Sequence, residues 1–296
     1  MALAYWQGSQ PEKGFKLFES ALIESMYLGA SPGGFQQLSF YDAMRGELYR
    51  DFADPIGVAA RALVEGLFGI KPNFINNELL IQPGFPKEWE QASLQLPDVS
   101  LSFKRTGNTE IYTLENKFST DLNLQLELNA AYSIIEELNV NGKIVTYTID
   151  TNALGAPQIN INAGNAKQYI IEIKWGGQTL DSITSKTKYV IQELLNIKTL
   201  DAEILEVYDP QKALFEINTS AKKIEAKINS GLGHKTVFIK LKHDEMIWWQ
   251  PIMFEVIPKI EIIHNHYSSE ILTLDLQSNS TETLEGTLQI NTNHQQ

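Results

Sequence analysis

The spacing of the apolar residues changes near residue 70, so this chain cannot be built from one kind of secondary structure. Phe15, Phe18, Leu22 and Met26 are spaced three, four and four residues apart, as on one face of a helix that begins near Pro11. Beyond residue 70 the apolar residues alternate with polar ones, which is the period of a strand half-buried in a sheet. The sequence therefore predicts an α+β multidomain protein, with a short helical segment followed by antiparallel β-sandwich domains.

A second helix is predicted from Asp54, which is followed by proline at the first helical position, to Gly69. Along it Val58, Ala62 and Gly66 recur at a spacing of four residues. Small residues on one face let another helix approach closely, so we expect this helix to pack within a helical layer.

The β part begins at residue 71 and has short strands separated by turn residues, which is typical of sandwiches. Its strongest turn is Asn141-Gly142, between two runs that read as the strands of a hairpin. We expect four parts: a helical remnant at 1–70, a β-sandwich at 71–177, a second at 178–258, and a small or incomplete β element at 259–296.

Composition narrows the possible partners. The net charge of −12 argues against nucleic acid, which requires clustered cations. No apolar run reaches the roughly 20 residues of a membrane span, so we expect no membrane insertion. The N-terminal residues lack the basic and apolar regions of a signal peptide, and none is expected in this chain.

The sequence predicts no cofactor and no metal. It has no cysteine, no dinucleotide fingerprint and no nucleophile elbow. His264 and His266 would point to one face of a strand, but no third ligand is apparent, so a solvated strand face is the simpler interpretation.

Residues 12–105 resemble the junction between a helical toroid and a β-sandwich in a known family. The matching features are a helix of small residues, the strand Leu79-Leu80-Ile81-Gln82-Pro83, and the motif Pro86-Lys87-Glu88-Trp89. Together they are similar to the C-terminal part of six-hairpin, (α/α)6-toroid glycosidase-like proteins, which are large and secreted by polysaccharide-degrading bacteria.

The resemblance implies that this chain is a C-terminal fragment of a glycoside hydrolase-like protein that acts on a glycan in the periplasm or outside the cell. The parent's chemistry would be inverting hydrolysis by two carboxyl groups. The remaining toroid helices would be missing here, so we expect no turnover by this chain alone. Either the missing toroid or self-association would cover the apolar stripe from Phe15 to Met26.

The resemblance makes three late carboxylates candidates for the catalytic base, of which at most one would serve: Asp54, Asp51 and Glu47. Each also has a plain structural interpretation, because Asp54 can cap its helix and the other two can form surface ion pairs. In an active site, Tyr41 and Arg45 could bind sugar hydroxyls.

Trp248 and Trp249 are the candidate carbohydrate-binding residues outside the helices. Neighbours in a strand face opposite ways, so one indole can fill the core while the other stacks on a sugar. The alternatives are a carbohydrate-binding module with an exposed indole, and a purely structural accessory region in which the tryptophans are largely buried and the helices pack on the first sandwich.

Overall fold

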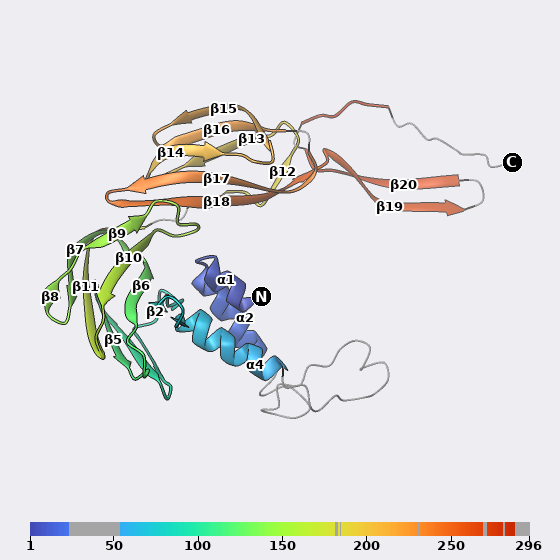
Figure 1. The fold of residues 1–296 in the computed structure, drawn as a ribbon. Coiled ribbons are helices and arrows are strands. Elements are labelled where there is room, and N and C mark those ends of the chain that lie inside the picture. Colours follow the sequence, from blue (N-terminus) through green and yellow to red (C-terminus); the bar gives the residue numbers. More distant parts are fainter. Residues whose placement is uncertain are drawn as a thin grey trace, which may run out of the picture. The chain divides into compact units, whose positions relative to one another are not determined.

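The computed structural model describes residues 1–23, 54–180, 183, 185–229, 231–268, 271–280 and 282–287 (Figure 1). The chain divides into two compact units. The first contains Met1–Ser182, Asp201–Leu205 and Lys240–Gln250, and the second contains Ile183–Leu200, Glu206–Ile239 and Pro251–Gln296. The described fold is mostly β strands in several sheets, with few helices, as the sequence predicted.

The described helices are α1 (Ala2–Gln7), α2 (Pro11–Ile23), α4 (Asp54–Arg61) and the π-helical turn η2 (Ala62–Leu67). The predicted starts at Pro11 and Asp54 are confirmed. Gly69 ends the last helix with φ of 66°, a conformation that glycine adopts without strain. These helices are too few to close a toroid within the described part of the chain. None of them is long and apolar enough to cross a membrane.

Two sheets of the first unit enclose its core. One has the order β1-β2-β6-β10-β9 and the other β3-β4-β5-β11-β7-β8. The strands of the first are β1 (Ile70–Asn73), β2 (Glu78–Ile81), β6 (Asn123–Asn129), β10 (Gln158–Gly164) and β9 (Tyr147–Asp150). Those of the second are β3 (Gln91–Gln95), β4 (Val99–Thr106), β5 (Thr109–Asn116), β11 (Gln168–Thr179), β7 (Tyr132–Val140) and β8 (Lys143–Ile144).

Alternation along these strands places one apolar set in the core. In β6, for example, Leu124, Leu126 and Leu128 are at most 1% exposed, while the residues between them are half-buried. The predicted hairpin is confirmed, since Asn141 and Gly142 both have positive φ between β7 and β8. This pair of angles matches the right-handed twist of the two strands.

The sequence predicts antiparallel sheets, but the first sheet also contains a parallel pair of strands. Strand β2 pairs parallel with β6. The chain leaves β2, builds three strands of the other sheet, and returns to β6 in the same direction. Such a crossover carries no local turn signal, so the strand pattern did not reveal it.

The sheets beyond residue 183 have the orders β12-β18-β17-β14 and β13-β16-β15. Their strands are β12 (Lys188–Val190), β13 (Leu194–Lys198), β14 (Glu203–Tyr208), β15 (Leu214–Ser220), β16 (Lys223–Ile228), β17 (Gly233–His243) and β18 (Met246–Ile257). The second unit has its own apolar core. The ring centroids of Tyr189 and Phe254 lie 5.2 Å apart in one sheet, and Ile197 and Ile224 are buried in the other.

A two-stranded ribbon follows in the second unit, formed by β19 (Ile260–Ser268) and β20 (Ile271–Ser278). All described residues of β19 are exposed, and so are all but one of β20. The ribbon lies within the residues 259–296 for which the sequence predicts a small or incomplete β element, and the division of the chain into four parts remains a prediction.

Candidate functional site: the helix–sandwich junction

A site of polar and aromatic side chains lies where the described helices of the first unit meet the sandwich. Trp6 of α1 is 6% exposed, and its indole N–H donates to the carbonyl oxygen of Gly84 at 3.0 Å. A methyl group added to Gly14, Gly66 or Gly84 would come within 2.9, 2.3 or 2.2 Å of the indole. The absence of side chains at these three glycines therefore creates the space that Trp6 fills.

The glycines come from three different segments, so the indole joins them. Gly14 lies in α2, Gly66 in η2, and Gly84 in the loop after β2. The predicted close approach at Gly66 is thus confirmed, with Trp6 as the approaching side chain. Val58 takes no part, because it is 65% exposed.

Aromatic rings continue from the helices into the sandwich core. Ring centroids lie 4.9–6.1 Å apart in the pairs Trp6–Phe18, Phe15–Trp89, Trp89–Phe85 and Phe85–Phe103. Pairs at this distance add about 0.5–1.5 kcal/mol each beyond the area that they bury. The apolar stripe of α2 is therefore covered by the first unit itself, at Phe15 and Phe18; Met26 lies outside the described residues.

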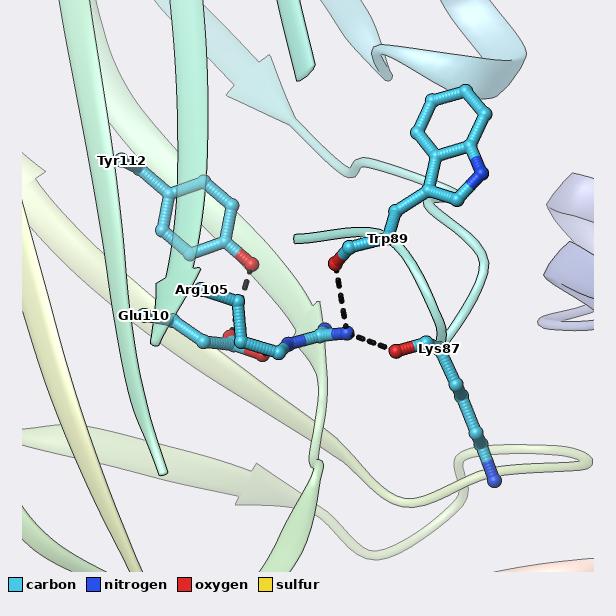
Figure 2. Close-up of polar contacts among 5 residues, drawn as sticks. All are labelled: Lys87, Trp89, Arg105, Glu110 and Tyr112. Atoms are coloured by element: carbon cyan, nitrogen blue, oxygen red, sulfur yellow. Dashed lines mark hydrogen bonds and ion pairs between the residues drawn. The ribbon is translucent and has the colours of Figure 1, made fainter. Parts of the chain in front are cut away.

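Arg105 on β4 holds the loop that carries this aromatic path (Figure 2). Its guanidinium contacts Glu110 Oε1, from Nη2 at 2.7 Å and from Nε at 2.9 Å. Its Nη1 donates to the carbonyl oxygens of Lys87 and Trp89, the latter at 3.3 Å. The Pro86-Lys87-Glu88-Trp89 motif is thus attached to the sheet through its backbone.

Glu110 completes the network inside the protein. It is 2% exposed, and the hydroxyl of Tyr112 donates to its Oε2 at 3.1 Å. Burial raises the pKa of Tyr112 well above its ordinary value, and the charge of Glu110 raises it further. A buried carboxylate is tolerated only when it is paired, so Arg105 and Tyr112 are the groups that make Glu110 acceptable here. We call the Trp6 cradle, the aromatic rings and this network the helix–sandwich junction.

The side chains of the carboxylates predicted from the resemblance all lie outside what the structure describes. Asp54 is the first residue of α4, but its side chain lies outside what the structure describes. Asp51, Glu47, Tyr41 and Arg45 also lie outside the described residues. Their roles remain predictions.

The predicted tryptophan pair is divided as strand geometry requires. Trp248 is 2% exposed and belongs to the core, whereas Trp249 is half-buried. The ammonium of Lys240 lies 5.3 Å from the ring centre of Trp249. The backbone of Trp249 bonds to Ala153 and Gly155. Stacking on a sugar face would require an indole that is more than half exposed. Neither Trp248 nor Trp249 is exposed to that extent.

One cluster in the first unit contains serine, aspartate and histidine without forming a nucleophilic triad. Ser133 is fully buried, and its hydroxyl donates to Asp244 Oδ2 at 2.5 Å and accepts from the Gln178 N–H at 3.0 Å. His243 Nε2 lies 3.9 Å from the same carboxylate oxygen. A serine nucleophile needs its hydrogen bond to be accepted by the imidazole, so this cluster instead attaches the β17–β18 turn to β7.

The second unit has a polar groove of about 690 Å³. Three of its four lysines are paired with glutamates of the groove, in the contacts Lys186–Glu193 at 2.5 Å, Lys227–Glu216 at 2.6 Å and Lys259–Glu282 at 3.9 Å. The fourth, Lys188, is paired with Glu255 at 3.3 Å. These charges largely cancel, so the groove has no strong preference for a ligand of either sign. Among the described residues, no group of three or more His, Asp or Glu side chains is placed to hold a metal ion.

Sequence reasoning did not find the central residues of the junction. The residues next to Trp6 in the sequence give no sign of its role. The three glycines that it contacts follow it by 8, 60 and 78 positions. Arg105 and Glu110 belong to no motif, and nothing in their spacing marks them as a buried pair. The Pro86-Lys87-Glu88-Trp89 motif was the available signal, but it identified the loop and not its partners.

Comparisons with protein-family models and with curated proteins give no match. Among solved structures, the gamma-CGTASE from Alkalophilic bacillus clarkii matches with 10% identity and a TM-score of 0.21. That match covers 58% of this chain and 26% of that chain, so this chain spans about a quarter of its length. The N-terminal periplasmic domain of ScsB from Proteus mirabilis matches with 6% identity and a TM-score of 0.18, over 56% of this chain and 98% of that one. At these TM-scores neither likeness assigns a fold or a function.

Proposed function

We propose that this chain is the β-rich support of the helical part of a glycan-acting protein of the six-hairpin glycosidase type. The observation that carries the proposal is the helix–sandwich junction, in which one indole and its glycines join the helices to the sandwich. The resemblance of residues 12–105 to a toroid–sandwich junction supports the same interpretation. In this proposal the β domains are scaffolding.

The finer parts of the proposal follow from the resemblance. Residues 1–70 are the last helices of a toroid, and 71–177, 178–258 and 259–296 are the β parts. The parent performs inverting hydrolysis in the periplasm or outside the cell, and this chain alone has no turnover. Glycoside hydrolysis by the purified chain, at a rate lowered by Asp54→Ala or Glu47→Gln, would contradict this part.

Hydrogen–deuterium exchange tests the supporting role directly. Gly84→Ala places a methyl group within 2.2 Å of the Trp6 indole, so the ring must leave its cradle. We expect the amides of α1 and α2 to lose protection by about tenfold or more, while those of β6 and β11 change little. Unchanged protection of α1 and α2 would mean that the junction does not hold the helices.

Gly57→Ala is the matched control for this experiment. Gly57 is exposed in α4, and a methyl group there would meet nothing within 4 Å. The same chemical change should therefore leave the exchange of α1 and α2 as in the wild type. Loss of protection in both variants would point to a general effect of the substitution and not to the cradle.

A carbohydrate-binding module that uses an exposed tryptophan is the second candidate function. It has less support, since Trp248 is in the core and Trp249 is half-buried. A glycan array distinguishes the two functions: saturable binding that Trp249→Ala abolishes would favour sugar recognition, and we expect none.

A further inference from the structure

The β19–β20 ribbon has one apolar face and one polar face, as its register shows. Directly paired residues lie on the same face of a ribbon, and the pairs include Ile262 with Leu276 and Tyr267 with Leu272. A bulge at Ile263 shifts the alternation of β19, so that the apolar residues of both strands meet. The apolar face consists of Ile260, Ile262, Asn265, Tyr267, Leu272, Leu274, Leu276 and Ser278.

This apolar face is open to solvent. Ile260, Ile262, Tyr267, Leu272 and Leu276 are 48%, 52%, 69%, 40% and 52% exposed. Monomeric proteins rarely leave so continuous an apolar patch uncovered, and an isolated two-stranded hairpin is only marginally stable in water. The ribbon therefore has the properties of an interaction surface.

We propose that this apolar face packs against the same face of a second copy of the chain. None of the eight residues of the face is charged. The acidic residues Glu261 and Asp275 of the described strands are paired with Gln277 and His264, on the opposite face. Two chains that each carry a net charge of −12 can therefore meet here without bringing carboxylates together. A neutral face also offers no attraction to a strongly basic partner.

The geometry of a ribbon favours a facing copy over a further strand. A third strand would pair along an edge, where it extends the sheet and leaves the apolar face open. A second ribbon stacked at about 10 Å covers the face directly, as in a sandwich. Two such faces together bury on the order of 1,200 Å², which is the lower end of the range for stable interfaces. The inference does not depend on the proposed glycan-related function.

Light scattering with size-exclusion chromatography tests the association. We expect the molar mass to rise from 33.4 kDa towards twice that value as the wild-type chain is concentrated from about 10 to 300 µM, a range suited to a small interface. Leu272→Asp with Leu276→Asp places two carboxylates in the apolar face. This variant should raise the dimer dissociation constant about tenfold or more, since the charges would be buried without partners.

Ile271→Asp with Thr273→Asp is the matched control, because it adds the same charges to β20 on the opposite face, where the paired residues are Ser268 and His266. It should associate like the wild type. A wild-type chain that stays at 33.4 kDa throughout, or two double variants that behave alike, would overturn the proposal.

Cross-linking tests which faces meet. The chain has no cysteine, so a single introduced thiol is unambiguous. Asn265→Cys lies in the middle of the apolar face and should give a cross-linked dimer with a short bifunctional maleimide. His266→Cys is its neighbour on the opposite face and should give far less. Equal yields from the two variants would contradict face-to-face packing.

Discussion

The stripe on α2 and the apolar face of the ribbon are both amphipathic patterns, yet the molecule treats them differently. Phe18 on the α2 stripe is 7% exposed and lies against Trp6, whereas Tyr267 on the ribbon is 69% exposed. The α2 stripe is covered by Trp6 of α1 and by Trp89 of the loop before β3, and the ribbon is covered by nothing in the described part of the second unit. An amphipathic pattern thus predicts that a face will be buried, but it does not predict whether the same chain or another molecule will bury it.

The largest effect on stability should come from removing the Trp6 indole from the space between the three glycines. Trp6→Ala removes a 6%-exposed indole and its hydrogen bond to Gly84, and the rigid glycine backbone cannot fill the space. We expect a loss of about 3–5 kcal/mol in the free energy of unfolding, measured with urea. Trp6→Phe keeps most of the ring volume and should cost clearly less. A loss below about 1 kcal/mol for Trp6→Ala would mean that Trp6 covers the α2 stripe too weakly to distinguish it from the uncovered face of the ribbon.

Removing the cation of the network should have the next largest effect. Arg105→Met keeps much of the side-chain volume but leaves the carboxylate of Glu110 buried without its cation. Because the Arg105 side chain is 23% exposed, we expect a loss of about 2–3 kcal/mol, below the full cost of breaking a buried pair. Adding Glu110→Gln should restore part of it, and strictly additive losses would show that the two side chains do not act together.

The sequence predicted element types well, because those depend on local periods. The starts of α2 and α4, the Asn141-Gly142 turn and the predominance of β structure were all accessible from residue spacing. The parallel pairing of β2 with β6 was not, since it depends on where a strand returns after an excursion of some forty residues. The spacing of apolar residues predicts which face of a strand is buried, but it does not predict which strand pairs with it in the sheet.

The junction could be predicted only in part for the same reason. The motif ending in Trp89 marked a loop at the boundary between helices and sandwich. That Arg105 would hold its carbonyls, or that Gly84 would accept from Trp6, depends on contacts between residues far apart in the sequence. The proposed catalytic residues came from resemblance alone, and they lie outside the part of the chain whose side chains the structure describes.

The dependence of unfolding stability on pH tests the polar network of the junction, through Tyr112. The folded-state pKa of Tyr112 is raised above the unfolded value of about 10. Its contribution to stability is therefore complete below pH 10 and is lost as the pH rises further, since the unfolded chain ionises first. Tyr112→Phe should cost about 1 kcal/mol at pH 7 through the lost bond to Glu110, and should weaken the alkaline fall in stability.

The comparison for this titration is the wild-type chain over the same pH range. Burial and the bond to Glu245 raise the pKa of Tyr147 to about 12, so the wild type and the variant share that alkaline response. Only the difference between their unfolding curves reports on Tyr112. Identical slopes above pH 10 would mean that the hydroxyl of Tyr112 is not held in the folded chain.

The smallest effect should come from the ribbon. Tyr267→Ala removes a large ring, as Trp6→Ala does, but this ring is 69% exposed and loses few contacts within its own chain. In the Leu272→Asp, Leu276→Asp background, which we expect to be monomeric, the free energy of unfolding should change by about 0.5 kcal/mol or less. In the wild-type background the same substitution should weaken dimerisation, because there the ring has a partner to lose. A loss above about 1.5 kcal/mol in the monomeric background would show that Tyr267 is covered within its own chain. The two amphipathic faces would then differ in degree only, and the second copy would no longer be needed to explain the ribbon.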